Sequence, residues 1–183
     1  MKPSYVEVGA CGLSCRLCPA YNRETSSRCE GCKSPGRMGA ACSILRCAFK
    51  RGVEFCGFCN ENTSCEKWRR HREASKTGDS FVSYQALEQN IATIQKAGIA
   101  EFEKQQKTRE QLLQAMLTEF NDGRSKSFFC IAAAVMKPEE LEAALNEARA
   151  KSAALDAKGK SEMLHYLLNC VADKKNYLLK LRK

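Results

Sequence analysis

Residues 11–32 read CGLSCRLCPAYNRETSSRCEGC, and this stretch decides how the first part of the chain can fold. It contains two C-x2-C pairs, and a third pair follows within CGFCNENTSC at residues 56–65. The pairs are Cys15/Cys18, Cys29/Cys32 and Cys56/Cys59. Two residues between cysteines let both sulfur atoms reach one metal ion around a tight turn, which the glycine within two of the pairs favours. The pattern therefore predicts metal binding.

Ten of the 12 cysteines lie within the first 65 residues, and only Cys130 and Cys170 lie beyond them. We expect a cytoplasmic protein, because the chain starts without an apolar leader segment. Paired cysteines in that reducing compartment are typical of metal sites, with disulfides as the alternative. The candidate metal ligands are Cys11, Cys15, Cys18, Cys29, Cys32, Cys42, Cys47, Cys56, Cys59 and Cys65.

Ten thiols fit more than one arrangement. They can form two four-cysteine zinc sites with two thiols to spare, or one such site and a bridged site of two zinc ions and six cysteines. The first two C-x2-C pairs make one natural set. A second set is Cys47, Cys56, Cys59 and Cys65. Cys42 competes for the second set, and the role of Cys11 stays open. We expect zinc, with an iron–sulfur cluster as the alternative cofactor.

The order and spacing of these motifs resemble a known family. Over residues 8–68 the chain resembles a prokaryotic cysteine-rich family of unknown function, whose pattern starts C-G-L-x-C-x-x-C-P-A. The motifs that carry the resemblance are CGLSCRLCPA at 11–20, CEGC at 29–32, Cys42 with Cys47, GVEFCGFC at 52–59 and CEK at 65–67. The resemblance implies a compact metal-binding domain with zinc as the expected ion. It implies no activity.

The formal charge of +9 is concentrated in the first part of the chain. Residues 1–78 carry 14 basic and 7 acidic side chains, which leaves +7. Zinc bound by four thiolates has a total charge of −2, so two such sites would bring the whole chain to about +5. The basic character can therefore balance metal sites, and it does not by itself indicate nucleic acid.

From Ser83 onward, apolar residues recur at the spacing of amphipathic helices. Ser83 is expected to cap the first helix, and Gly98 interrupts the pattern before the second. Pro138 suits the first turn of a later helix, with Met136 and Leu141 forming a hydrophobic staple across its start. The expected helices begin at residue 83, cover 99–121, 127–136 and 138–155, and begin again after a cap at Ser161.

These contrasts predict a mainly α protein in three parts. Residues 1–66 form a small irregular domain stapled by metal, because they contain too few apolar residues to fold unaided. Residues 67–80 form a charged connector, and residues 81–183 form a helical domain. No apolar run approaches the roughly 18 residues of a membrane helix, so we expect no membrane contact.

The run Lys67–Arg72 combines one tryptophan with basic side chains. Trp68 could stack on a base of a nucleic-acid strand while its neighbours neutralise phosphates. The alternative, which we favour, is a solvated segment whose tryptophan packs on the cysteine-rich domain. His71 and His165 are the only histidines, and each is expected to be a packed or solvated side chain.

Three functions are compatible with the sequence. The first is a zinc-dependent binding or adaptor module with a protein or nucleic-acid partner, and the second is an iron–sulfur redox or electron-transfer protein. The third is an enzyme whose pocket is expected to lie between the two domains. The residues for that site are Arg124, Ser125, Lys126 and Cys130. We expect Cys130 and Cys170 to be buried thiols, because free cysteine is a common core residue.

Overall fold

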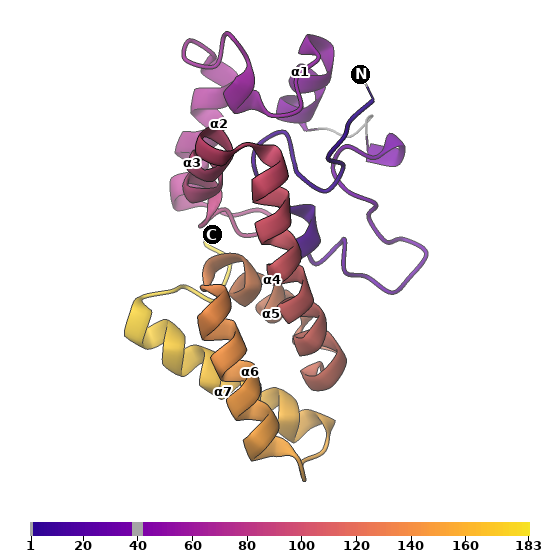
Figure 1. Ribbon diagram of the computed structural model, residues 1–183, viewed down its shortest axis with the longest axis vertical. Coiled ribbons are helices and arrows are strands. Elements are labelled where there is room, and N and C mark those ends of the chain that lie inside the picture. The colour runs from indigo at the N-terminus through magenta and orange to yellow at the C-terminus, as the bar shows by residue number, and fades with distance from the viewer. Residues whose placement is uncertain (1, 38–41) are drawn as a thin grey trace. The chain divides into compact units, whose positions relative to one another are not determined.

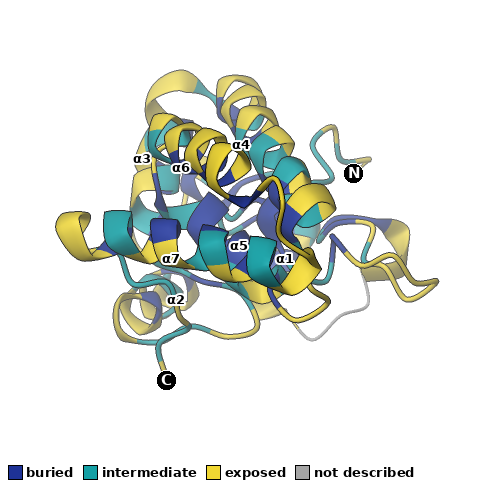
Figure 2. Ribbon diagram, turned by 90° about the horizontal axis from the view of Figure 1, so that it is seen from below, coloured by how far each residue is buried: buried dark blue, intermediate teal, exposed yellow. Residues whose placement is uncertain are grey.

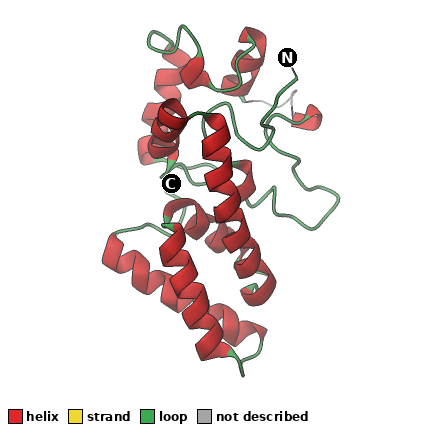
Figure 3. Ribbon diagram, viewed as in Figure 1, coloured by secondary structure: helices red, strands yellow, loops and turns green. Residues whose placement is uncertain are grey.

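The structure is a computed structural model that describes residues 2–37 and 42–183. Helices make up the regular structure of these residues, which contain no strand and one isolated bridge between Val8 and Ser14 (Figure 3). The predicted mainly α fold is confirmed, and the cysteine-rich segment is irregular. Contacts divide the chain into two compact units, Met1–Gln106 with Arg182–Lys183, and Lys107–Leu181.

The first unit combines short turns with helices (Figure 1). Its helices are α1 (Ser43–Arg51), α2 (Glu66–Thr77), α3 (Leu87–Ala97) and the start of α4 (Ile99–Phe120), which continues into the second unit. Its 3-10 turns are η1 (Cys15–Leu17), η2 (Pro35–Arg37) and η3 (Cys56–Phe58). Gly52 ends α1 in the left-handed conformation with φ 67° and donates its N–H to the last carbonyls of the helix, as a C-terminal glycine typically does.

The core of the first unit is shared between the cysteine-rich segment and the helices that follow it. Phe55 is fully buried and meets Trp68 edge to face, with ring centroids 6.0 Å apart. The buried residues of this core are Val8, Ala10, Ile44, Leu45, Ala48, Phe55, Cys56, Trp68, Leu87, Ile91, Ile94, Ile99 and Phe102. The cysteine-rich segment therefore draws apolar partners from α2, α3 and α4. This is why the first unit extends to Gln106 instead of ending at residue 66, and why the expected connector is a packed helix.

The end of the chain belongs to the first unit. The Asp79 side chain, which has no exposed surface, accepts hydrogen bonds from the backbone and guanidinium of Arg182. The same guanidinium donates to the carbonyls of Ser75 and Lys76, at 2.9 and 2.7 Å. Those carbonyls lie in the last turn of α2, so Arg182 caps that helix.

The second unit contains the rest of α4 with α5 (Lys126–Val135), α6 (Pro138–Ser152) and α7 (Ala157–Lys175). Each of these helices has buried and exposed residues (Figure 2), and most of the buried ones are apolar. Met136 and Leu141 are fully buried on either side of the α6 start, and Pro138 occupies its first turn, as predicted. Arg109 of α4 donates to the carbonyls of Ala133 and Met136 and so caps α5.

Two helix starts differ from the sequence prediction. Helix α3 begins at Leu87, after a turn in which the Ser83 hydroxyl accepts the Gln85 N–H at 3.3 Å. Helix α7 begins at Ala157, because Asp156 accepts the Gly159 N–H at 2.7 Å. The cap of α7 thus lies upstream of the expected serine, whereas α3 starts downstream of Ser83, after Ala86, which makes no side-chain cap. None of the helices in the described residues is both long and apolar enough to cross a membrane.

Candidate metal centre

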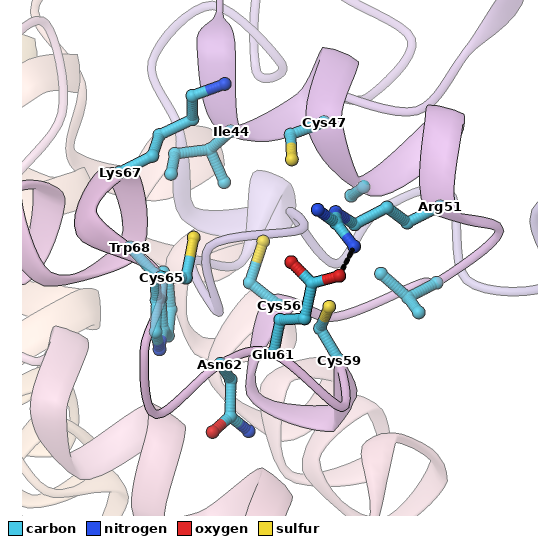
Figure 4. Close-up of a pocket in the computed structure, with 12 residues that line it drawn as sticks. Ile44, Cys47, Arg51, Cys56, Cys59, Glu61, Asn62, Cys65, Lys67 and Trp68 are labelled. Carbon is cyan, nitrogen blue, oxygen red and sulfur yellow. Dashed lines mark hydrogen bonds and ion pairs between the residues drawn. The ribbon is translucent and has the colours of Figure 1, made fainter.

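Four cysteines of the first unit surround one small cavity. Figure 4 shows their sulfur atoms facing the same space, with Cys47 from α1, Cys56 from η3, Cys59 just after it and Cys65 directly before α2. The cavity has a volume of about 20 Å³. A single water-sized group needs roughly 10–15 Å³ of such volume, so one ion of that size fits. These four residues are the second ligand set expected from the sequence.

Local structure explains why two of these thiols lie on the same side. The Cys59 N–H donates to the Cys56 carbonyl at 3.1 Å, which closes η3 into a tight turn. Gly57 is required within this turn for space: a Cβ atom there would lie 2.3 Å from Cε1 of Phe55. The turn therefore lies directly against the core of the unit.

Charged side chains surround the cavity. Arg51 forms an ion pair with Glu61 beside the sulfur atoms (Figure 4), and this pairing raises the pKa of Arg51. Burial, together with the neighbouring thiols, raises the pKa of the Cys56 thiol to about 12. In the absence of metal this thiol is therefore protonated, and a bound ion would have to displace its proton.

The thiols of the first two C-x2-C pairs form a second group. Cys15 and Cys18 are buried together with Tyr21, and Cys32 packs against them. The Cys32 N–H donates to Cys15 Sγ at 3.1 Å. A hydrogen bond from the Cys15 thiol lowers the pKa of Cys32 to about 7, and it raises the pKa of Cys15 together with burial. Cys29 lies near Cys18, whose pKa is raised by burial and by both neighbouring thiols.

The remaining two candidate ligands have different environments. Cys42 is exposed and caps α1, since its sulfur accepts the Leu45 N–H at 3.5 Å. Burial, with a smaller effect of Cys32, Cys42 and Cys56, raises the pKa of Cys11 to about 12.

Neither group of thiols has the geometry of a completed metal site. Zinc holds each thiolate sulfur at about 2.3 Å. Among the described residues, no group of three or more His, Cys, Asp or Glu side chains is placed closely enough to hold a metal ion. The structure thus brings the candidate ligands into two groups without completing a metal-binding geometry.

Side chains of the basic run after Cys65 pack or form ion pairs within the protein. Trp68 is only 4% exposed, so its ring is covered by the core and does not face solvent for base stacking. Arg69 and Arg70 both pair with Glu66. His71 stacks on Trp68 with ring centroids 6.0 Å apart. Burial lowers the pKa of His71, and the negative charge of Glu88 partly offsets this by raising it. The packed interpretation of this tryptophan is confirmed.

One of the residues considered for catalysis, Ser125, belongs to a closed hydrogen-bond network. Ser125 is buried, and its hydroxyl donates to Asp122 at 2.8 Å. Because a hydroxyl has one proton, Ser125 accepts from the Ser161 hydroxyl at 2.7 Å and from His165 Nε2 at 2.9 Å. His165 is thus a donor to Ser125, whereas a catalytic histidine would accept the serine proton. Burial lowers the pKa of His165, and Asp122 opposes that effect.

The other members of that set do not extend the network. Arg124 is exposed, Lys126 is half-buried, and Cys130 is 1% exposed in the core of the second unit. Cys170 is half-buried on α7. The expectation of a buried thiol is confirmed for Cys130 and is only partly met for Cys170.

The first unit is defined by paired cysteines, knuckle-like turns and a helical cover, which together characterise a small cysteine-rich domain. Residues 7–70 match the model of a family described as "Protein of unknown function (DUF3795)". This match supports the resemblance to an uncharacterised family. No curated protein and no solved structure matches the chain.

Proposed function

We propose that the protein is a structural zinc protein, in which thiolate coordination stabilises the first unit as a binding module. The observation that carries this proposal is the convergence of four thiols on one cavity of about 20 Å³. A single ion suits that volume, whereas a cluster of several irons and sulfides needs far more space. Cys47, Cys59 and Cys65 are only half-buried, so their side chains have room to rotate inward between rotamers.

The proposal favours a binding module over an enzyme for a chemical reason. The network around Ser125 directs the serine proton to the Asp122 carboxylate and uses His165 as a donor, so no histidine is placed to accept that proton. The thiols at the cavity would serve as ligands, since zinc with four protein ligands has no open position for substrate. Four-cysteine zinc sites of this closed kind contribute directly to folding free energy.

Metal analysis of the full chain, purified without oxygen, tests the proposal. We expect stoichiometric zinc and a colourless sample. Cobalt replacing zinc should give the intense absorption of tetrahedral thiolate coordination. Cys59→Ser should remove one metal equivalent, while Cys170→Ser, a matched change on α7 in the second unit, should remove none. Stoichiometric iron with sulfide would favour the electron-transfer alternative, and protein without bound metal would refute metal binding altogether.

A further inference from the structure

Lys33 is an unusual side chain for its position. It follows directly after the Cys29/Cys32 pair, in a segment of turns near the surface, yet it is only 1% exposed. Lysine is rarely buried unless its charge is paired, because moving an ammonium group out of water is costly. The surroundings of Lys33 must therefore contain negative charge.

One source of that charge is Glu54. Its carboxylate accepts Lys33 Nζ at 3.1 Å. It also accepts the backbone N–H of Ser4, at 2.5 Å, and that of Tyr5, at 3.2 Å. Glu54 is thus shared among three donors, and its side chain keeps 18% of its surface exposed. One shared and partly solvated carboxylate is weak compensation for an ammonium group that is sealed from water.

The second source is the thiol group of the first two pairs. Lys33 directly follows Cys32 in the chain, and thiolate charge on Cys15 or Cys32 would favour the charged form of Lys33. The Cys32 N–H already points at Cys15 Sγ, at 3.1 Å. A backbone N–H directed at sulfur and a nearby cation are the outer-shell partners that stabilise metal-bound thiolates. One hydrogen bond of the outer-shell kind is thus already directed at a sulfur atom of this group.

We propose that Cys15, Cys18, Cys29 and Cys32 bind a second thiophilic divalent cation, with Lys33 as the buried counter-charge of this thiolate site. The proposal rests on the proposed function, since both sites use zinc-type chemistry, but it concerns different residues. Four thiolates around a divalent ion carry −2 in total, and Lys33 places one positive charge beside them. Lys33 is a positioning residue, because it acts on the ligands and does not bind the ion.

Stepwise transfer of zinc from the full chain to a chromophoric chelator tests this second site. The wild-type protein should release two equivalents, and Cys59→Ser identifies the equivalent held at the cavity. Lys33→Met keeps the length of the side chain and removes its charge. We expect roughly 10–100-fold weaker zinc binding at the second site, as for other outer-shell changes, and binding at the cavity within about twofold of wild type.

A double variant separates charge compensation from simple pairing with Glu54. If Lys33 only neutralises that carboxylate, Lys33→Met/Glu54→Gln should restore binding at the second site, because neither charge is left unpaired. If Lys33 compensates the thiolates, the double variant should stay as weak as the single variant. The double variant leaves no unpaired buried charge, so it should fold. Zinc binding at the cavity serves as the control for folding.

The outcomes distinguish the two proposals. Release of only one equivalent from the wild type, lost in Cys59→Ser, would overturn the second site and leave the proposed function intact. Restored affinity in the double variant, or unchanged affinity in Lys33→Met, would overturn the role of Lys33. Absence of any bound zinc would overturn the proposed function as well.

Discussion

Replacing Gly57 by alanine is the sharpest test of the link between the core and the candidate metal site. The added Cβ would lie 2.3 Å from Cε1 and 2.7 Å from Cζ of Phe55, so atoms must move by about 1 Å to reach ordinary contact. Phe55 cannot give way easily, because it is fully buried between the rings of Phe58, at 5.2 Å, and Trp68, at 6.0 Å. Overpacking of this kind costs about 1–3 kcal/mol, and the rigid ring places Gly57→Ala at the upper end.

Trp68 is the only tryptophan, and it lies in the affected core, so its fluorescence follows the unfolding of the first unit. Denaturant titration of the zinc-loaded chain should show a loss of about 2–3 kcal/mol in the free energy of unfolding for Gly57→Ala. Gly36→Ala is the matched control, since a Cβ at Gly36 meets nothing within 4 Å. It should change the free energy of unfolding by less than about 0.5 kcal/mol. Equal effects of the two substitutions would refute the packing argument.

Three further predictions follow from the same structure. Removing metal with a strong chelator should disorder the whole unit Met1–Gln106, α3 included, while the helical circular dichroism of Lys107–Leu181 persists; loss confined to residues 1–66 would contradict the shared core. Trp68→Ala should destabilise the protein by about 3–5 kcal/mol, because it empties a buried site. Titration of the wild-type chain with short single- and double-stranded nucleic-acid probes at two salt concentrations should show no stacking contribution from this buried ring. Burial opposes ionisation of Asp79, but the hydrogen bonds of Arg182 outweigh it and hold its pKa below the usual 3.8. The unfolded chain therefore takes up the proton first, so this stabilisation is present above pH 3.8 and is lost as the pH falls through the lower folded-state value. Asp79→Asn should lower stability at pH 7 by about 1–3 kcal/mol and flatten its acid dependence in denaturation curves measured between pH 3 and 7.

Much of the helical architecture was predictable from local patterns. The apolar spacing, the glycine at position 98 and the staple around Pro138 each depend on residues within a turn or two of each other. Such patterns predicted a helix over 99–121, against the observed Ile99–Phe120. They were less accurate where two candidate caps lay close together, as at Asp156 and Ser161, because the cap is decided by which side chain meets a free N–H.

The candidate ligands were also predictable as residue types, and so was one grouping of them. The C-x2-C spacing predicts a tight turn, because this spacing lets two sulfur atoms reach one ion. Glycine is present in two of these turns for different structural reasons, which the cysteine spacing does not reveal. Gly31 adopts φ 110°, whereas Gly57 leaves room for the Phe55 ring.

Only the tertiary structure decided how the cysteine-rich segment obtains a core. The segment alone has few apolar side chains, and its partners come from α2, α3 and α4, which lie further along the chain. The same long-range packing buries Trp68 and encloses Lys33 beside Cys15 and Cys32. Periodicity reports which face of a helix is apolar, but it carries no information on which distant segment covers that face. Domain extent and the environment of each charge were therefore decided by three-dimensional packing.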